Sequence, residues 1–590
     1  MGRENIMDKI KASDAIFKFL KSLGVRHIFG VPGGGCMHLY NSAFNTPGLK
    51  LIPSFHEQAS GLAAQSYSEL SGGIAVCLVT AGPGMTNVVT AMAACWIEST
   101  PVLFIGGQAK TADSAKTLGL RSLGQQEVDG VAIARPLTKM AIQITSSDHL
   151  IECLPEAVNA ALSGRKGPVF LEIPLDVQAS ILDQEIKLNT FASQRKNIDI
   201  NTEAAKIDTL LKDLQISSKP AMLIGAGVRS SESHKDLIAF CERNQIAMLY
   251  TWKALQLCNE DHVQNFGRPG GICQPYANDV LQSCDLFISI GARNDLVSVA
   301  FDYANYAMES KARYFIDIDP NELKKYTLEK DYCLELDAAV FIEQLVKSSE
   351  SYAFGAVNRT FWLQNCQSLK RSKHILSYHP EVEGFVCTYR LVDYLSNHVN
   401  DCHVLVPGSS GSCSDIFMQA FRVSGDIQIQ NAPGLGAMGT CLPAITGAFL
   451  AFDEKRRVVS IVGDGGFQFN LQELQTIKNL NVNAVIFVLN NNGYASIRRS
   501  QQNHFGNNIH TDPDSGIKLS PIKDVADLFK FKYMLLQSNE QARLSMADLL
   551  QDNGQTLVEV MIDPSEDVRP RVGATIVNGR LVSGNMRDYK

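Results

Sequence analysis

The feature that most constrains the fold of this chain is a pair of apolar segments, each of which runs into a turn rich in glycine or asparagine. Residues 458–462 read VVSIV and lead into GDGG (463–466), and residues 484–489 read AVIFVL and lead into NNNG (490–493). An amphipathic helix is predicted between them, near residues 471–479. This alternation predicts a parallel sheet covered by helices, in which ligands bind at the carboxyl ends of the strands.

The two turns carry the chemistry of a metal–diphosphate site. Glycines let the backbone approach phosphate oxygens, and a helix N-terminus offers free N–H groups with a partial positive charge. Asp464 and Asn491 offer side-chain oxygens, Gly493 offers a carbonyl, and Mg²⁺ prefers about six oxygen ligands. A lone GDG sequence is usually only a turn. Two such turns, with 24 residues between Gly465 and Asn490, are a more specific signal.

The same alternation of strands and helices extends over most of the 590 residues. We predict three Rossmann-like α/β domains with parallel sheets, at residues 8–182, 202–349 and 374–562. The polar stretches 183–201 and 347–373 are expected to link them, and the tail, 563–590, is expected to be irregular. The predicted strands are 27–31, 74–80, 101–106 and 169–173, then 221–224, 286–290 and 314–318, then 404–406, 457–462, 484–489 and 556–561.

Composition excludes several classes of protein. A net charge of −7 argues against a nucleic-acid binder, which needs a basic surface. The charged first residues do not form a signal peptide, and no apolar run is long enough to span a bilayer. The 14 cysteines include no CxxC pair, so neither a structural zinc site nor a disulfide scaffold is expected. These observations predict a cytoplasmic protein that binds neither nucleic acid nor membrane.

The first predicted domain holds a second set of motifs. Glu57 lies in SFHEQ (54–58), between IFGVPGGG (28–35) and TAGPGMTN (80–87). Alone, Glu57 would be interpreted as an exposed glutamate at a helix start, and His56 as a structural residue. Together with the GDGG and NNNG turns, these motifs resemble the acetolactate-synthase-like family of thiamine-diphosphate-dependent enzymes in order and spacing. The resemblance covers nearly the whole chain.

The resemblance implies domains that bind the pyrimidine and diphosphate ends of the cofactor, with a central domain between them. It implies thiamine diphosphate and Mg²⁺ as cofactors, with Asp464, Asn491 and the Gly493 carbonyl as the metal ligands. The Glu57 carboxyl would exchange a proton with the aminopyrimidine ring. Other positions associated with catalysis or substrate contact are Gly34, Gln126, Lys139 and Ile497. Cofactor contacts are expected from Pro32, Gly33, Gly84, Asn87, Ser410, Ser412, Gly436, Met438, Gly463, Gly465 and Gly466.

Two parts of the resemblance are incomplete. In the central domain, IGAG (224–227), GARND (291–295) and IDIDP (316–320) are similar to the region that holds FAD in acetolactate synthase, but the match is partial. Bound FAD therefore stays open. In the last domain, SGSCS (410–414) stands where acetolactate synthases have Gly-Gln-His-Gln, so the individual diphosphate contacts stay open as well.

The implied reaction is decarboxylation of pyruvate or a similar 2-oxo acid, followed by carboligation of the acyl unit to a carbonyl acceptor. Gln125 and Ser500 stand where acetolactate synthases carry phenylalanine and tryptophan. Polar groups there suit a bulky, hydroxylated acceptor. The loop that contains Ser500 resembles the yersiniose-type enzymes, which transfer an acetyl unit to a nucleotide-linked keto-deoxysugar, and Arg498 or Arg499 would then pair with the nucleotide diphosphate.

Other functions stay open. Acetolactate synthase proper, which condenses two pyruvates, shares the motifs, and a pyruvate oxidase would need FAD. A simple decarboxylase is less well supported because no His-His pair occurs in the chain. A non-enzymatic binding protein is disfavoured because Glu57, Asp464 and Asn491 are all intact. The resemblance also implies a homodimer or homotetramer in which the Glu57 segment faces the diphosphate-binding segment of a neighbouring subunit.

Overall fold

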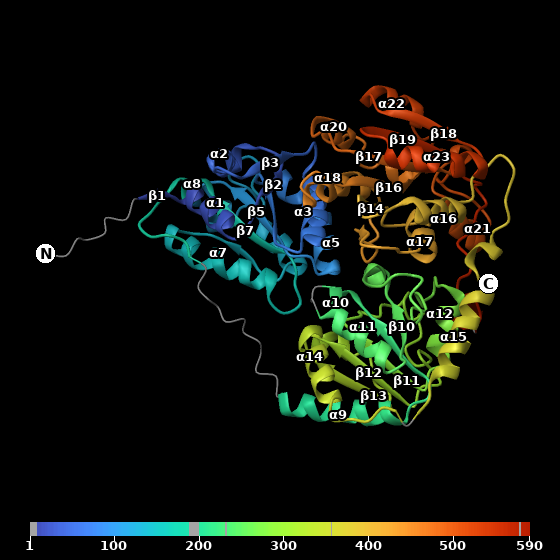
Figure 1. Ribbon diagram of the computed structural model, residues 1–590. Helices are drawn as coiled ribbons and strands as arrows, with labels where there is room; N and C mark the ends of the chain where they lie inside the picture. Colours follow the sequence, from blue (N-terminus) through green and yellow to red (C-terminus); the bar gives the residue numbers. More distant parts are fainter. Residues whose placement is uncertain (1–8, 188–199, 230–232, 356, 578–579, 590) are drawn as a thin grey trace.

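Three α/β domains, each built on a parallel sheet, make up the protein (Figure 1). The computed structural model describes residues 9–187, 200–229, 233–355, 357–577 and 580–589. The strand orders are β3-β2-β4-β5-β7-β6, β10-β9-β11-β12-β13 and β15-β14-β16-β17-β19-β18. Helices cover both faces of each sheet, so the central strands are apolar throughout, as buried parallel strands are. The predicted fold class is confirmed.

The first domain surrounds a sheet of six strands. The strands are β2 (His27–Gly30), β3 (Lys50–Pro53), β4 (Ala75–Val79), β5 (Val102–Gln108), β6 (Ala141–Gln143) and β7 (Val169–Pro174). The helices are α1 (Ala12–Ser22), α2 (Met37–Asn45), α3 (Glu57–Ser71), α4 (Pro83–Asn87), α5 (Val89–Glu98), α6 (Gly130–Ala134), α7 (Ser147–Leu162) and α8 (Leu175–Ala179). A small antiparallel pair, β1 (Ile10–Lys11) with β8 (Ile181–Leu182), brings the two ends of the domain together.

The central domain is built in the same way around five strands. These are β9 (Pro220–Ile224), β10 (Ala247–Tyr250), β11 (Leu286–Ile290), β12 (Ala312–Asp317) and β13 (Asp331–Glu335). The helices are α9 (Ile200–Ile216), α10 (Ala226–Arg229), α11 (His234–Arg243), α12 (Pro275–Ser283), α13 (Pro320–Leu323) and α14 (Ala338–Ser349). The stretch expected to link this domain to the next contains a further helix, α15 (Thr360–Ser372), and its Trp362 is buried against the central core.

The third domain has six strands. These are β14 (His403–Pro407), β15 (Gln428–Ile429), β16 (Arg457–Gly463), β17 (Ala484–Asn490), β18 (Lys532–Leu536) and β19 (Gln555–Met561). The helices are α16 (Thr388–His398), α17 (Ser412–Ala420), α18 (Cys441–Ala451), α19 (Asp464–Phe467), α20 (Glu473–Asn479), α21 (Ala495–Phe505), α22 (Ile522–Phe529) and α23 (Asn539–Gln551). The tail was expected to be irregular. Part of it is ordered, because β20 (Ala574–Val577) and β21 (Arg580–Ser583) form an antiparallel hairpin.

The first and third domains meet where α3 packs along α18 (Figure 1). A Cβ added to Gly447 of α18 would lie 2.1 Å from the carbonyl oxygen of Ala63 in α3. The Ser66 hydroxyl of α3 donates to the Ala444 carbonyl across the same contact, at 2.9 Å. Only a residue without a side chain allows this approach, so the small residues of both helices fix how the two domains dock.

Membrane insertion finds no support in the described part of the chain, where no helix combines the length and the apolar character needed to cross a bilayer.

We expect Gly447→Val to lower the thermal midpoint of unfolding, because the added side chain collides with the α3 backbone. Overpacking at a tight contact costs about 1–3 kcal/mol. The matched control is Gly73→Val at the end of α3, where an added Cβ meets nothing within 4 Å. Equal melting temperatures for the two variants, measured by calorimetry, would show that the α3–α18 contact is not close in solution.

Candidate active site

Glu57 is the first residue of α3, at the carboxyl edge of the first sheet. Its Oε2 accepts a hydrogen bond from the Asn87 side-chain amide at 2.9 Å, and Asn87 ends α4. A Cβ added to Gly84 would lie 3.6 Å from Glu57 Oε1. The structure therefore brings three of the predicted residues together and holds the carboxyl by one amide.

The glycine loop after β2 lies beside this carboxyl. Gly33 has no room for a side chain, since an added Cβ would lie 2.5 Å from the Thr80 side chain, and the Gly35 N–H donates to Thr80 Oγ1 at 3.1 Å. Gly34 is different, because an added Cβ would meet nothing within 4 Å. Pro32 and Gly34 are both exposed at this edge. The loop therefore presents open backbone on the side where the resemblance places the cofactor.

The predicted metal ligands converge at the carboxyl ends of β16 and β17. Asp464 is buried, and its two carboxylate oxygens accept from the backbone N–H groups of Gly465 and Gly493 at 2.8 and 2.9 Å. The Asn491 side-chain oxygen is buried and has no hydrogen-bond partner in the described part of the chain. Gly493, with φ 127°, ends this turn. A carboxylate, an orphaned amide oxygen and a nearby backbone carbonyl are the donor set that Mg²⁺ prefers.

Electrostatics supports a cation at this point. Burial raises the pKa of the Asp464 carboxyl to about 6, because the low-dielectric surroundings disfavour the charged form. A divalent cation would reverse that penalty by pairing with the carboxylate. The residues present therefore fit Mg²⁺, with Asp464, Asn491 and the Gly493 carbonyl as the groups that would hold it.

The remaining diphosphate contacts lie on neighbouring loops of the same sheet edge. Gly411, with φ 71°, precedes α17, so Ser412 stands at a helix N-terminus, whose N–H groups suit an anion. Gly436, with φ 64°, would place a Cβ 4.0 Å from the Ser410 side chain. Met438 is 41% exposed on the loop that leads to α18. Gly463 has nothing within 4 Å of an added Cβ, whereas one on Gly465 would lie 2.4 Å from the Tyr494 ring.

A cavity of about 290 Å³ lies beside Asp464. Asn490 and Asn492 line it on one side, and the segment 513–522 lines it on the other, with Lys518 as the only cation among the lining residues that the structure describes. Its volume is close to the lower limit of small-molecule sites.

Two residues that sequence reasoning missed connect the first and third domains within one chain. Glu473 accepts a hydrogen bond from the backbone N–H of Phe55 at 3.0 Å, two residues before Glu57. Asn470 donates to the carbonyl of Gly439, beside Met438, and to the side chain of Gln58, beside Glu57. The one signal in the sequence was a pair of polar residues at the start of an otherwise amphipathic helix.

Other predicted residues are placed differently. The Gln126 backbone, with φ 62°, packs on Gly82, and its side chain is exposed. Ile497 is 53% exposed on α21, which directly follows the metal loop. Lys139 precedes β6, at the opposite edge of the first sheet from Glu57, and its ammonium donates to the Ser163 carbonyl at 2.6 Å. The structure does not bring Lys139 to the site within this chain.

The two arginines expected to meet a nucleotide diphosphate are already engaged. Arg498 donates to the backbone carbonyls of Asn491 and Asn492 at 3.1 and 3.3 Å, and so braces the metal loop. Arg499 pairs with Asp567 at 2.7 Å. The expectation that either side chain reaches out to a nucleotide is therefore corrected, since both hold the chain's own backbone or tail.

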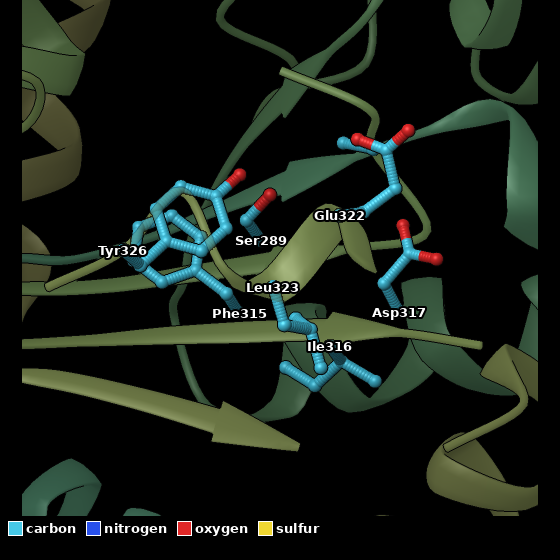
Figure 2. Close-up of a pocket in the computed structure, with 8 residues that line it drawn as sticks. Ser289, Phe315, Ile316, Asp317, Glu322, Leu323 and Tyr326 are labelled. Atoms are coloured by element: carbon cyan, nitrogen blue, oxygen red, sulfur yellow. The ribbon is translucent and has the colours of Figure 1, made fainter. Parts of the chain in front are cut away.

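The central crevice, where bound FAD stayed open, is narrowed by the protein's own backbone, and Figure 2 shows the small pocket beside it. A dinucleotide in a doubly wound fold lies where the strand order reverses, which here is between β9 and β11. At that point Gly227 donates to the carbonyl of Gly291 at 2.9 Å, and a Cβ on Gly225 would lie 2.2 Å from the same oxygen. Next to it, the Tyr326 ring stacks on Phe315 at 3.5 Å between centroids. The hollow that remains has a cavity volume of about 0 Å³.

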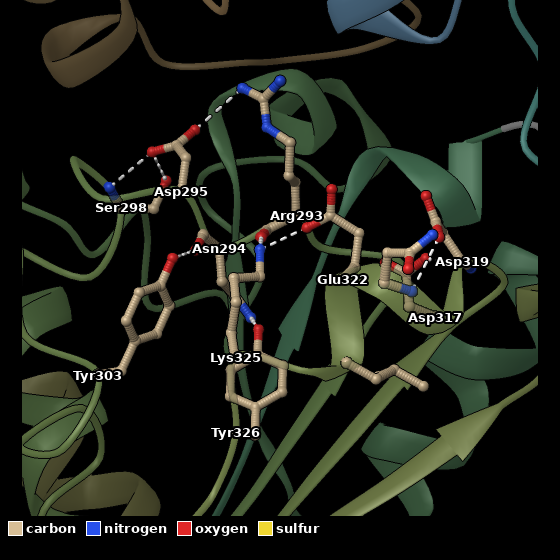
Figure 3. Close-up of polar contacts among 12 residues, drawn as sticks. Arg293, Asn294, Asp295, Ser298, Tyr303, Asp317, Asp319, Glu322, Lys325 and Tyr326 are labelled. Atoms are coloured by element: carbon tan, nitrogen blue, oxygen red, sulfur yellow. Dashed lines mark hydrogen bonds and ion pairs between the residues drawn. The ribbon is translucent and has the colours of Figure 1, made fainter.

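Asp319 of the IDIDP motif and the nearby Glu322 are also engaged (Figure 3), and Asp317 accepts from the Asp319 backbone N–H at 2.9 Å. Arg165 of the first domain bonds Asp319 and Glu322 at 2.9 and 2.8 Å, and Lys325 pairs with Glu322 from the other side. The Asn294 amide joins Ser289 and Tyr326, each at 3.0 Å. These described residues close the crevice and dock it on the first domain, so they do not fit FAD and we derive no step through a flavin.

Comparison with known proteins agrees with this geometry. Residues 10–133 match the N-terminal TPP binding domain of thiamine pyrophosphate enzymes, residues 207–345 match the central domain, and residues 409–560 match the C-terminal TPP binding domain. The large subunit of acetolactate synthase from Lactococcus lactis is 28% identical, over 99% of both chains.

Two further relatives are equally similar. The probable acetolactate synthase large subunit of Methanocaldococcus jannaschii is 28% identical, over 94% of this chain and 93% of its own. The acetolactate synthase isozyme 2 large subunit of Escherichia coli is 28% identical, over 95% and 97%. The three domain matches, in the order in which the structure shows the three sheets, establish that the chain belongs to the thiamine pyrophosphate enzymes and is an enzyme of acetolactate-synthase-like type.

Proposed function

We propose that this enzyme uses thiamine diphosphate and Mg²⁺, without a flavin, to decarboxylate pyruvate or a similar 2-oxo acid and to transfer the acyl unit to a carbonyl acceptor. The observation that carries the proposal is the convergence of the Asp464 carboxylate, the unpartnered Asn491 amide oxygen and the Gly493 backbone at the carboxyl ends of β16 and β17. The relatives are acetolactate synthases, and this supports pyruvate as the acyl donor.

Each group of residues has a separate task. Asp464, Asn491 and the Gly493 carbonyl would hold Mg²⁺ against the diphosphate, and the open backbone at Gly463 and Ser412 would contact its oxygens. The Glu57 carboxyl would hold the proton that it exchanges with the aminopyrimidine, while Asn87 fixes Oε2. Bound thiamine diphosphate supplies a nucleophilic carbon that takes up the electron pair when CO₂ leaves.

The two halves of the site should fail in different ways. Glu57→Gln removes the proton exchange but keeps the shape and the Asn87 contact, so we expect turnover to fall by about 10²–10⁴-fold while cofactor affinity changes little. Asp464→Ala removes the anionic metal ligand, so we expect loss of Mg²⁺-dependent cofactor binding. Calorimetric titration with thiamine diphosphate, alongside steady-state kinetics, separates the two effects.

Glu540→Ala is the matched control, because Glu540 is an exposed carboxylate in the first turn of α23 that pairs only with Arg543 among the described ion pairs. It should leave both measurements unchanged. Turnover by Glu57→Gln above about a tenth of wild type, or unchanged cofactor affinity in Asp464→Ala, would contradict the assigned roles.

Two acceptors compete for the second half of the reaction. A second pyruvate is suggested by the relatives, which are acetolactate synthases. A nucleotide-linked keto-deoxysugar is favoured by Gln125 and Ser500, which are both exposed and polar in the structure. The engagement of Arg498 and Arg499 removes one argument for the sugar, so the acceptor rests on the first two residues alone.

The assay supplies the purified protein with pyruvate, thiamine diphosphate and Mg²⁺, and compares kcat/KM for the two acceptors by mass spectrometry. We expect carboligation with no flavin added, and no flavin absorbance in the purified protein. Hydrogen peroxide as product, or activity that depends on FAD, would overturn the flavin-free proposal. Faster acetolactate formation would reject the sugar acceptor, and Ser500→Trp should shift selectivity toward pyruvate.

We also propose a cytoplasmic homo-oligomer. All 14 cysteines are free thiols, which suits a reducing compartment. Large apolar side chains stay exposed around the site in a single chain, and burial of such a patch favours association. They are Phe55, Met438, Phe469, Ile497 and Phe505.

We therefore expect light scattering to give the mass of a dimer or tetramer, with dissociation on dilution accompanied by loss of activity. A fully active monomer would refute the oligomer. The exposed apolar side chains would then serve substrate binding and not association.

A further inference from the structure

The metal loop, residues 490–494, has an unusual backbone. Asn492 adopts φ 62° and Gly493 adopts φ 127°, so two consecutive residues lie in the left-handed region. Residues other than glycine rarely adopt this region, and they keep it only where the surrounding structure holds them there. The contacts of this loop therefore identify what fixes the predicted metal ligands.

Two N–H groups of the loop are held by nearby backbone and side chains. The Gly493 N–H donates to Asp464 Oδ2 at 2.9 Å, and the Tyr494 N–H donates to the Thr511 carbonyl at 2.8 Å. Gly493 has no space for a side chain, since an added Cβ would lie 2.2 Å from the same Thr511 oxygen. These contacts leave the carbonyl groups that precede Gly493 to another partner.

Arg498 holds those carbonyl groups. It lies one turn into α21, and its side chain is 16% exposed. One guanidinium nitrogen donates to the Asn492 carbonyl at 3.3 Å, and the other donates to the Asn491 carbonyl at 3.1 Å and to the Pro564 carbonyl at 3.3 Å. A guanidinium presents its N–H groups in a rigid, planar fork. The fork therefore sets the orientation of the two peptide groups that lead into Gly493.

Charge alone does not account for a cation at this place. Arg498 contacts the backbone of Asn491, whose side chain is a predicted ligand of Mg²⁺, and two positive charges repel each other. Its hydrogen bonds within the described part of the chain all go to backbone carbonyls, and the carboxylate of its ion-pair partner Asp512 is 3.9 Å away. What the side chain supplies is therefore orientation of the loop.

We propose that Arg498 is a positioning residue for the metal centre, which orients the Asn491 side-chain oxygen and the Gly493 carbonyl through the peptide groups between them. The proposal rests on the proposed function, in which these two groups hold Mg²⁺. The Gly493 oxygen faces the GDGG turn, 3.6 Å from where a Cβ on Gly465 would lie. Arg498, its acceptors and the metal ligands all belong to the third domain and tail of one chain, so the role does not depend on how subunits assemble.

The experiment separates orientation from charge. Arg498→Lys keeps the positive charge but loses the fork, and Arg498→Met loses both. Arg499→Met is the matched control, because it removes a positive charge from the next residue of α21. The described partners of Arg499 are Asp567 and the Glu566 carbonyl, and neither belongs to the metal loop.

Two quantities are measured on the full-length protein. The first is the Mg²⁺ concentration that gives half-saturation of thiamine diphosphate binding, by calorimetry. The second is amide hydrogen exchange of the peptide that covers residues 490–497, in the protein without metal or cofactor. We expect Arg498→Lys and Arg498→Met to raise the required Mg²⁺ concentration by about 10- to 100-fold, as loss of a group that orients a metal ligand does, and to speed exchange. Arg499→Met should match wild type in both.

Wild-type Mg²⁺ dependence in Arg498→Lys, or an equal loss in Arg499→Met, would overturn the proposal, because charge or the tail would then be the cause. Weaker Mg²⁺ binding with wild-type exchange in residues 490–497 would overturn it too. If Arg498→Met fails to fold, Arg498→Lys decides the outcome. Failure of wild type to bind thiamine diphosphate with Mg²⁺ would reject the proposed function and the role of Arg498 with it, whereas normal binding by wild type and variants alike rejects that role alone.

Discussion

The close crossing of α3 and α18 is the contact on which the arrangement of the domains depends. Glu57 begins α3, and the loop that carries Met438 leads into α18, so this crossing fixes how the domains that carry these two residues are placed within one chain. Gly447 and Ala63 allow the two backbones to approach, and Ser66 bonds across the contact. A larger residue there would separate the helices and, with them, the groups at their ends. The small residues of α3 therefore serve the arrangement of the domains as well as the helix.

The central strands could be predicted because burial on both faces leaves a continuous apolar run. The predicted strand 286–290 coincides with β11, and 484–489 differs from β17 by one residue. Edge strands lack this signal. β13 and β18 each bury only one of their five residues, and β15 has only two residues, so none of them stands out from its surroundings. The β20–β21 hairpin in the tail was missed for a similar reason, since it is short and lies outside the three sheets.

Site residues could be predicted where they directly follow a strand that the sequence itself indicates. Asp464 and Asn491 meet because parallel strands end at one edge of a sheet, which the strand pattern already implies. Residues whose role depends on a distant partner could not be placed. The Lys139 ammonium is bound by Ser163, 24 positions away, and Asn470 bonds Gln58, 412 positions away. No local pattern distinguishes such a residue from an ordinary polar side chain.

The glycines show most clearly why a motif alone does not establish a binding site. A glycine that lets phosphate approach the backbone equally lets another backbone approach. At Gly225 and Gly291 the neighbour is protein, since an added Cβ at either would lie within 3 Å of the other turn's backbone. At Gly34 and Gly463 an added Cβ meets nothing within 4 Å, and neither residue has a positive φ. The protein's own packing does not require glycine at these two positions, so their absent side chains leave space for a ligand. Gly34 and Gly463 thus leave open backbone in the turns where we propose that the cofactor binds, whereas Gly225 and Gly291 are packing contacts.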